Sequence, residues 1–195
     1  MNDFNAEPAA LRSAELVAVE RVLNSGWYVL GQEVRAFEQA WAGRCGTTRA
    51  AGVGNGMDAI EIGLRALDVG PGDEVITTPM TAFATVLAIV RAGATPVLAD
   101  IDPRTALLAP ESVERCITSQ TRAVVLVHLY GQIHDMDNWV ELCARHGIAL
   151  LEDCAQAHLA EWNGTVAGSF GRAGAYSFYP TKNLGAIGDG GALVS

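Results

Sequence analysis

The sequence lacks any long uncharged apolar segment and carries few charges, and both absences narrow the classes of protein it can belong to. No stretch of about 18 apolar residues occurs without a charge, which argues against a membrane-spanning helix. Charged residues make up 18% of the chain and hydrophobic residues 50%, as in a globular protein with a sizeable core. The net charge of −9 argues against non-specific binding to nucleic acid or to an anionic membrane.

The sequence also lacks the paired cysteines of a zinc site or a redox motif. Its four cysteines are scattered without a CxxC pair, so we expect small buried apolar side chains and no metal site. The acidic pair Asp100 and Asp102 is more typical of a turn than of metal ligands. The first residues, MNDFNAEPAALRSAE, are polar and show no signal-peptide pattern. We therefore expect a protein of the reducing cytoplasm.

The chain does contain a regular alternation of short apolar runs and helical patterns. The runs are RAAGV, EVITT, TPVLAD, AVVLVHL and IALLED. Helical patterns separate them over Met57–Leu67, Ala82–Arg91, Pro110–Ile117 and Met136–Arg145. Runs rich in Val, Ile, Leu and Ala indicate strands buried on both faces. The alternation predicts an α/β fold with a mostly parallel central sheet and right-handed crossovers.

Two further helical patterns, Ala9–Ser25 and Glu33–Arg44, precede this alternation, and shorter strand-like pieces, GTVAG, AGAYSFY and GGALVS, follow it. We therefore divide the chain into an N-terminal helical segment, residues 1–48, and a domain over residues 49–195. Ligands of parallel sheets bind at the carboxyl ends of the strands. The residues expected at that edge are Asn55–Gly56, Thr78–Phe83, His128–Tyr130 and Asp153.

Lys182 lies in a glycine-rich loop between two strand-like runs, in the segment SFYPTKNLGAIGDGG. A lysine amine condenses with an aldehyde to form a Schiff base, and the glycines around it let the backbone approach a ligand closely. These features favour a catalytic lysine over an exposed surface lysine.

Asp153 ends the run IALLED, where its carboxylate could bind the protonated nitrogen of a pyridine ring; a helix cap or a structural ion pair is the alternative. Gln156 could donate to a ring oxygen or make an ordinary loop contact. His158 is as compatible with a structural role as with a ligand contact.

The turn GNGMDA precedes a helical pattern, and the first N–H groups of a helix bind anions. Gly56, Met57 and Asp58 could therefore hold a phosphate, with Asp58 as a plain capping residue the alternative. Ser177 could add a hydroxyl donor.

Two aromatic side chains lie near these positions. Phe83 could stack on a heteroaromatic ring or belong to the core, and we expect Tyr179 on the sheet. Together the lysine, the aspartate and the anion-binding turn match the needs of pyridoxal phosphate.

These motifs resemble those of the pyridoxal-phosphate-dependent nucleotide-sugar aminotransferases, the DegT/DnrJ/EryC1/StrS family. The similarity runs from about Asn24 to Ser195 and rests on GNGMDAIEIGLRAL, GDEVITTPMTAFAT, GATPVLADID, HLYGQ, LLEDCAQAH, GSFG and SFYPTKNLGAIGDGGA. The resemblance implies the three-layer α/β architecture of pyridoxal-phosphate transferases of fold type I. Residues 49–195 would form an incomplete cofactor-binding large domain, without the C-terminal small domain.

The resemblance also implies a role for each matching position. Lys182 would bind the cofactor's aldehyde and move protons, and Asp153 would pair with the pyridine nitrogen. The other contacts would be made to the ring hydroxyl by Gln156, to the ring face by Phe83, and to the phosphate by Gly56, Met57 and Ser177.

The implied partners are L-glutamate as amino donor, a nucleotide-linked keto-sugar as acceptor, and a second subunit in a homodimer. GNGMDA and HLYGQ resemble members that aminate C3 of a dTDP-linked keto-deoxysugar.

The sequence departs from the family pattern in two ways. Met57 replaces a usual threonine or serine and offers the phosphate only its N–H. The chain also ends soon after the lysine loop, so we expect a fragment, a chain completed by another polypeptide, or a decayed copy.

Two alternative functions stay open: a truncated non-catalytic subunit that pairs with a full-length relative, and a sugar dehydratase that uses pyridoxal or pyridoxamine phosphate. Lys182 speaks against the dehydratase, because related dehydratases carry histidine there.

Overall fold

Seven strands form one central sheet in the computed structural model, which describes residues 3–195. They are β1 (Ala50–Val53), β2 (Glu74–Thr77), β3 (Thr95–Leu98), β4 (Thr121–Val127), β5 (Ala149–Asp153), β8 (Ala173–Ser177) and β9 (Gly191–Val194). Their order across the sheet is β1-β9-β8-β5-β4-β2-β3. A separate antiparallel hairpin consists of β6 (Glu161–Trp162) and β7 (Thr165–Val166).

Six α-helices accompany the strands within residues 3–195. They are α1 (Ala9–Ser25), α2 (Gln32–Cys45), α3 (Gly56–Ala66), α4 (Phe83–Ala92), α5 (Pro110–Cys116) and α6 (Met136–His146). Two short 3₁₀ helices, η1 (Phe4–Ala6) and η2 (Leu129–Gly131), complete the regular elements. Each of the six helical patterns in the sequence corresponds to one of these α-helices, with ends that differ by one residue at most.

The predicted parallel character of the sheet is confirmed for most of its strands. Strands β3, β2, β4, β5 and β8 pair in parallel, and β9 runs antiparallel to both of its neighbours, β8 and β1. The expectation that every run is buried on both faces is wrong for β1 and β3. Both are edge strands, and none of their residues is fully buried.

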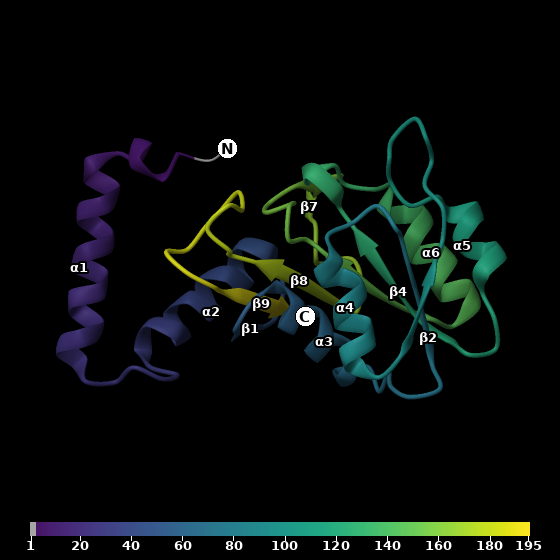
Figure 1. The fold of residues 1–195 in the computed structure, drawn as a ribbon, viewed down its shortest axis with the longest axis horizontal. Coiled ribbons are helices and arrows are strands. Elements are labelled where there is room, and N and C mark those ends of the chain that lie inside the picture. The colour runs from purple at the N-terminus through teal and green to yellow at the C-terminus, as the bar shows by residue number, and fades with distance from the viewer. Residues whose placement is uncertain (1–2) are drawn as a thin grey trace.

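Alternating side chains of the sheet face two helical layers, which gives the expected three-layer arrangement (Figure 1). On one face Val75, Val125 and Leu151 pack against α3 and α4. On the other face Ile76, Leu126 and Leu150 pack against α5 and α6. Because strand side chains alternate, Asp153 shares the face of Leu151, and Glu152 shares the face of Leu150.

Helix α2 covers the β8–β9 end of the second face with an aromatic cluster. The Trp41 ring lies 5.0 Å from Tyr176 and 5.1 Å from Phe178, between ring centroids and nearly perpendicular in both cases. Trp41 and Phe37 belong to the apolar stripe that predicts this helix. The side chains of Cys45 and Cys154 complete the cluster. All four cysteines are free, and only Cys116 is less than fully buried.

Helix α1 projects from the body of the protein, as the purple helix of Figure 1 shows, and none of its residues is buried. The Arg21 guanidinium joins it to α2 through a 2.7 Å contact with Glu33. The predicted N-terminal segment, residues 1–48, includes Met1 and Asn2, which lie outside the described residues, and its boundary stays a prediction. No helix in residues 3–195 has the length and hydropathy that a bilayer span requires.

Candidate functional site

A pocket of about 330 Å³ lies at the carboxyl edge of the sheet, where α3, β5 and β8 meet. Its lining includes five of the seven residues to which the family resemblance assigns a cofactor contact: Gly56, Met57, Asp153, Ser177 and Lys182. These residues are separated by up to 126 positions in the chain (182 − 56). The sheet topology brings them together because β1, β5 and β8 point the same way and end at the same edge.

A second pocket, of about 420 Å³, adjoins the first at Lys182. It is lined by Tyr130, Gln156 and Asn183, together with Thr181 and Lys182, which line both pockets. The Gln156 side chain is oriented by a hydrogen bond of 2.8 Å that its Oε1 accepts from the Tyr130 N–H. Lys182 therefore lies between the predicted phosphate-binding turn and Gln156.

The Asp153 carboxyl is buried and lines the first pocket. Its Oδ2 accepts a hydrogen bond of 2.8 Å from the Thr85 hydroxyl, and its Oδ1 accepts one of 3.1 Å from the Ala155 N–H. Burial raises the pKa of Asp153, and these two bonds and the charge of Lys182 oppose that effect. A carboxyl placed in this way gains from a cationic partner in the pocket.

The α3 N-terminus begins inside the pocket and is capped by Asn55. The Asn55 Oδ1 accepts a hydrogen bond of 2.9 Å from the Asp58 N–H. The possibility that Asp58 is the capping residue is therefore wrong: Asp58 lies in the first turn, and its carboxylate is 3.4 Å from Arg91. Gly56 and Met57 precede it at the helix start, where N–H groups have no acceptor within the helix.

Gly56 permits a close approach between α3 and β8. A Cβ at this position would lie 2.6 Å from the Cβ of Ser177. Ser177 is buried, and its Oγ accepts a hydrogen bond of 3.4 Å from the Tyr179 N–H. The Met57 thioether accepts a contact of 3.9 Å from Arg91. Met57 thus directs its sulfur to a cation on α4, and its N–H remains for an anion.

The loop that carries Lys182 is closed by main-chain hydrogen bonds. The Phe178 N–H donates to Gly190 and the Ala186 N–H donates to Phe178, both at 2.7 Å. Within the loop the Lys182 N–H donates to the Tyr179 carbonyl at 2.8 Å, and the Lys182 side chain is half-buried. The backbone therefore holds Lys182 at the junction of the two pockets.

Two aromatic residues differ from the expectations above. Phe83 opens α4 beside the first pocket, but its side chain is 74% exposed, so the core alternative is wrong. It lines neither pocket, and stacking on a ligand ring stays a prediction. Tyr179 lies beyond the end of β8 at Ser177, so it is not a sheet residue; it is 50% exposed and lines the first pocket.

His158 belongs to the aromatic cluster and to neither pocket. Its ring centroid lies 5.3 Å from that of Phe178 and 5.9 Å from that of Trp41. Burial lowers the pKa of His158, which favours a neutral structural ring.

The Asp100–Asp102 pair forms a turn, in which the Asp102 Oδ1 accepts from the Arg104 N–H at 2.8 Å, as expected.

The sequence places Asn55 and Tyr130 at this edge without assigning them a role, and it does not single out Thr85; the structure shows what each of the three does. Thr85 is buried and bonds Asp153, Tyr130 orients Gln156, and Asn55 caps α3. An asparagine directly before a helical pattern is a known capping signal, so Asn55 could have been recognised. Nothing in the sequence indicates which threonine of TPMTAFAT reaches Asp153.

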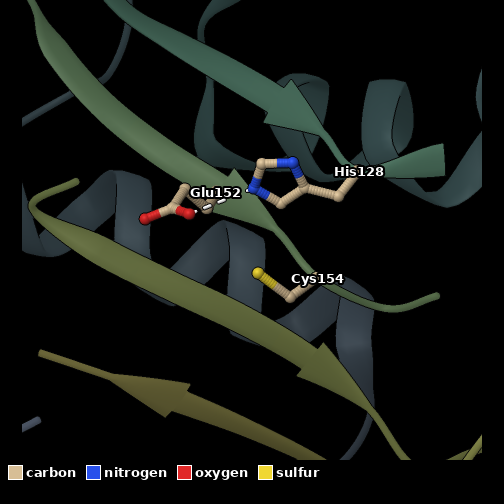
Figure 2. Close-up of side chains that lie close together, drawn as sticks. All are labelled: His128, Glu152 and Cys154. Atoms are coloured by element: carbon tan, nitrogen blue, oxygen red, sulfur yellow. Dashed lines mark hydrogen bonds and ion pairs between the residues drawn. The ribbon is translucent and has the colours of Figure 1, made fainter. Parts of the chain in front are cut away.

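The structure also brings together three residues of metal-binding type, which the scattered cysteines did not suggest. His128, Glu152 and Cys154 place one potential ligand atom each within 4.8 Å of the others (Figure 2). Hydrogen bonds already occupy this group: His128 bonds Glu152 at 3.0 Å, and Glu152 accepts from three backbone N–H groups. Burial raises the pKa of the Cys154 thiol well above its usual range, which disfavours the thiolate that a metal requires.

A comparison with family profiles shows the family to which this chain belongs. The profile of the DegT/DnrJ/EryC1/StrS aminotransferase family matches residues 9–195. The chain belongs to this family. It is 47% identical over 193 residues to the dTDP-3-amino-3,4,6-trideoxy-alpha-D-glucose transaminase of Streptomyces venezuelae, a match that covers 99% of the chain and 51% of that relative.

Two solved structures carry the comparison to the fold. DesV of S. venezuelae in complex with a ketimine intermediate has a TM-score of 0.96 and 47% identity, over 99% of this chain and 52% of that one. NtdA of Bacillus subtilis with bound cofactor PMP has a TM-score of 0.90 and 31% identity, over 96% of this chain and 42% of that one. The chain thus spans about half the length of the relatives it matches.

The residues present fit the cofactor expected in the DegT/DnrJ/EryC1/StrS family. A buried carboxyl whose pKa burial raises, the N-terminus of a helix and a lysine line the same pocket. This donor set suits a ligand with a basic ring nitrogen, an aldehyde and a phosphate, because each of these groups has a partner of complementary chemistry in the same pocket.

Proposed function

We propose that the protein uses pyridoxal phosphate in the cytoplasm to transfer an amino group from L-glutamate to a dTDP-linked 3-keto-deoxysugar. The observation that carries this proposal is the pocket that joins Lys182, Asp153 and the start of α3. Bound pyridoxal phosphate supplies an aldehyde that takes up the amino group and a ring that accepts electrons when the ring nitrogen is protonated.

Asp153 holds the proton on the ring nitrogen. Its carboxylate is costly to bury without a cation, so ligand binding offsets a cost that the cofactor-free protein bears. The Thr85 hydroxyl and the Ala155 N–H aim both carboxylate oxygens. Lys182 would supply the amine that holds the cofactor's aldehyde, and its Nζ would act as the base that moves a proton at the reacting carbons.

The remaining residues orient the ligand. The N–H groups of Gly56 and Met57 and the Ser177 hydroxyl bind the phosphate, and Phe83 covers the ring face. Because the Gln156 Oε1 is occupied by the Tyr130 N–H, its Nε2 is the atom that donates to the ring hydroxyl oxygen. Together these donors would hold the cofactor in the pocket that Lys182 also lines.

The substrate class rests on the relatives. A transaminase whose name specifies a dTDP-linked 3-amino sugar is 47% identical to this chain over the 193 aligned residues. That identity supports a dTDP-linked keto-sugar with the carbonyl at C3 as the acceptor. The homodimer is proposed from the family resemblance alone.

An assay of the purified full-length protein with pyridoxal phosphate tests this proposal. With L-glutamate and a dTDP-linked 3-keto-deoxysugar, we expect 2-oxoglutarate and amino sugar in equal amounts, and neither product from Lys182→Ala. Loss of water from the sugar without 2-oxoglutarate would indicate the dehydratase instead. Failure of the protein to bind cofactor, together with capture of a full-length relative, would indicate the non-catalytic subunit.

A further inference from the structure

Glu152 is a fully buried carboxylate that lies beside Asp153 in β5 but on the opposite face of the sheet. Its Oε1 accepts hydrogen bonds of 2.8 Å from the N–H groups of Phe170 and Gly171. Its Oε2 accepts one of 2.7 Å from Gly168 and one of 3.0 Å from His128 Nε2. Four bonds fill the acceptor capacity of an ionised carboxylate. Glu152 is therefore a fixed anchor with no free oxygen lone pair.

The bond to Glu152 fixes the orientation of the His128 ring. Because an ionised carboxylate can only accept, His128 Nε2 must donate, and Figure 2 shows this nitrogen directed at Glu152. The opposite nitrogen, Nδ1, lies 3.1 Å from Nδ1 of His134. Both rings are buried, with relative exposures of 0% and 4%. Burial lowers the pKa of His134 to about 3, so its ring is neutral and shares one proton with His128.

The contact between the two rings closes a short turn. His128 and His134 are six residues apart, and the chain between them includes η2. Tyr130 lies in this turn with a left-handed backbone, φ 57°, and Gly131 follows at φ 81°. A left-handed conformation at a non-glycine residue costs free energy that its surroundings must offset. The Nδ1–Nδ1 contact spans the turn and opposes its relaxation.

The strained turn faces the candidate site. The Tyr130 N–H donates to the Gln156 Oε1 at 2.8 Å. A Cβ on Gly131 would lie 3.2 Å from the Gln156 carbonyl oxygen, so the turn also packs closely on the backbone of that residue. The position of Gln156 therefore depends on the conformation of a turn that the two histidines hold closed.

We propose that Glu152, His128 and His134 form a buried clamp that positions Gln156 at the candidate site. Glu152 fixes the His128 ring, and the His128 ring holds His134 through the Nδ1–Nδ1 contact. The turn that is closed in this way presents the Tyr130 N–H to Gln156. None of the three side chains lines either pocket, so they are positioning residues. The link to cofactor binding rests on the proposed function; the link to Tyr130 and Gln156 does not.

Amide hydrogen exchange of the cofactor-free full-length protein tests the clamp directly. His134→Phe keeps an aromatic ring against Trp139, whose ring lies 5.6 Å away, and removes the bond to His128. We expect the Tyr130 N–H to exchange about three- to tenfold faster, as the loss of one hydrogen bond predicts. His134→Asn, which returns a polar group near the Nδ1 position, should restore slow exchange. His146→Phe, the same substitution at a partly exposed site on α6, should leave Tyr130 unchanged.

A second variant keeps the test decisive if His134→Phe does not fold. In His128→Gln the amide can still donate to Glu152, but the partner of His134 is lost, so Tyr130 should again exchange faster. Unchanged exchange at Tyr130 in either folded variant would overturn the clamp.

The absorbance of bound pyridoxal phosphate extends the test to the site. We expect His134→Phe to shift the pH midpoint of the cofactor band in the same direction as Gln156→Ala, and to add nothing in the double variant, because both act through Gln156. A shift that persists in the Gln156→Ala background would contradict this route. If the unmodified protein forms no cofactor band, the proposed function fails, while the exchange experiment still decides the clamp.

Discussion

Thr85 donates a hydrogen bond of 2.8 Å to the buried carboxylate of Asp153, and thereby connects the first turn of α4 to the end of β5. The Thr85 hydroxyl donates its only proton to Asp153, so the Thr81 hydroxyl, which lies 2.8 Å from that of Thr85, must donate to Thr85. A chain of two hydroxyls therefore leads from the surface turn before α4 to the acidic group that lines the pocket.

Thr85→Val should weaken the fold because it removes a hydrogen bond from a buried carboxyl. We expect the free energy of unfolding to fall by about 1–3 kcal/mol, measured by urea denaturation. Thr81→Val leaves the Asp153 bond in place and should cost clearly less. Equal losses of unfolding free energy in the two variants would show that the bond to Asp153 contributes no more to stability than the bond between the two threonines.

Asp153→Asn should stabilise the cofactor-free protein, and more so as the pH rises. Because burial raises the pKa of Asp153 in the folded state, folded protein binds more protons than unfolded protein between the ordinary carboxyl pKa and the raised one. Stability therefore falls as pH rises through that window and stays lower above it. The Asp153→Asn variant has no carboxyl to titrate, so its stability advantage should grow as the pH rises from the ordinary carboxyl pKa through the raised pKa of Asp153.

Denaturation curves at several pH values check this expectation, with the exposed Asp135→Asn as control. A pH-independent difference between Asp153→Asn and the unmodified protein would contradict the assignment. The same variant should bind pyridoxal phosphate more weakly, since it cannot pair with a cationic ring nitrogen.

Gly56→Ala should disturb the junction of α3 and β8. The new Cβ would lie 2.6 Å from the Ser177 Cβ, so backbone must move, at a cost of about 1–3 kcal/mol. Gly43→Ala in α2 is the matched control, because its Cβ meets nothing within 4 Å and alanine favours a helix by about 0.5–1 kcal/mol. The midpoint temperature of thermal unfolding should therefore fall in Gly56→Ala and rise in Gly43→Ala. An unchanged unfolding midpoint in Gly56→Ala would contradict the inference that the close approach of α3 and β8 requires glycine at this position.

Glu152→Gln should be strongly destabilising although it conserves shape. The amide NH₂ group would face N–H donors that the carboxylate oxygens accept, leaving at least one buried donor without a partner. We expect a loss of about 1–3 kcal/mol or more in urea denaturation. The exposed Glu161→Gln in β6 should change stability little.

The sequence predicts the layered part of this structure well because the apolar period of each element is unambiguous. The stripe of Phe37 and Trp41 in α2 and the buried run of β4 each have one compatible element type. The edge positions of β1 and β3 were not predictable, since an apolar run does not specify its neighbours. The antiparallel insertion of β9 between β1 and β8 is likewise a property of the whole topology.

The same limit applies to the site. Lys182, Asp153 and the turn at Gly56 could be selected because their residue types match one chemistry, and the fold brings them to one pocket. The orienting roles of Thr85, Tyr130 and the buried Glu152–His128 pair could not be predicted, although His128 and Tyr130 were expected at this edge, because these roles lie in contacts between residues distant in sequence. Sequence reasoning thus finds the reactive groups more readily than the residues that orient them.

The most direct test of the account concerns the amine of Lys182. Borohydride reduction of the full-length protein incubated with pyridoxal phosphate, followed by peptide mass mapping, should place the cofactor mass on the peptide that contains Lys182, and Lys182→Ala should remain unlabelled. Labelling at other lysines only, or no labelling, would contradict the assignment of Lys182 as the residue that binds the cofactor's aldehyde.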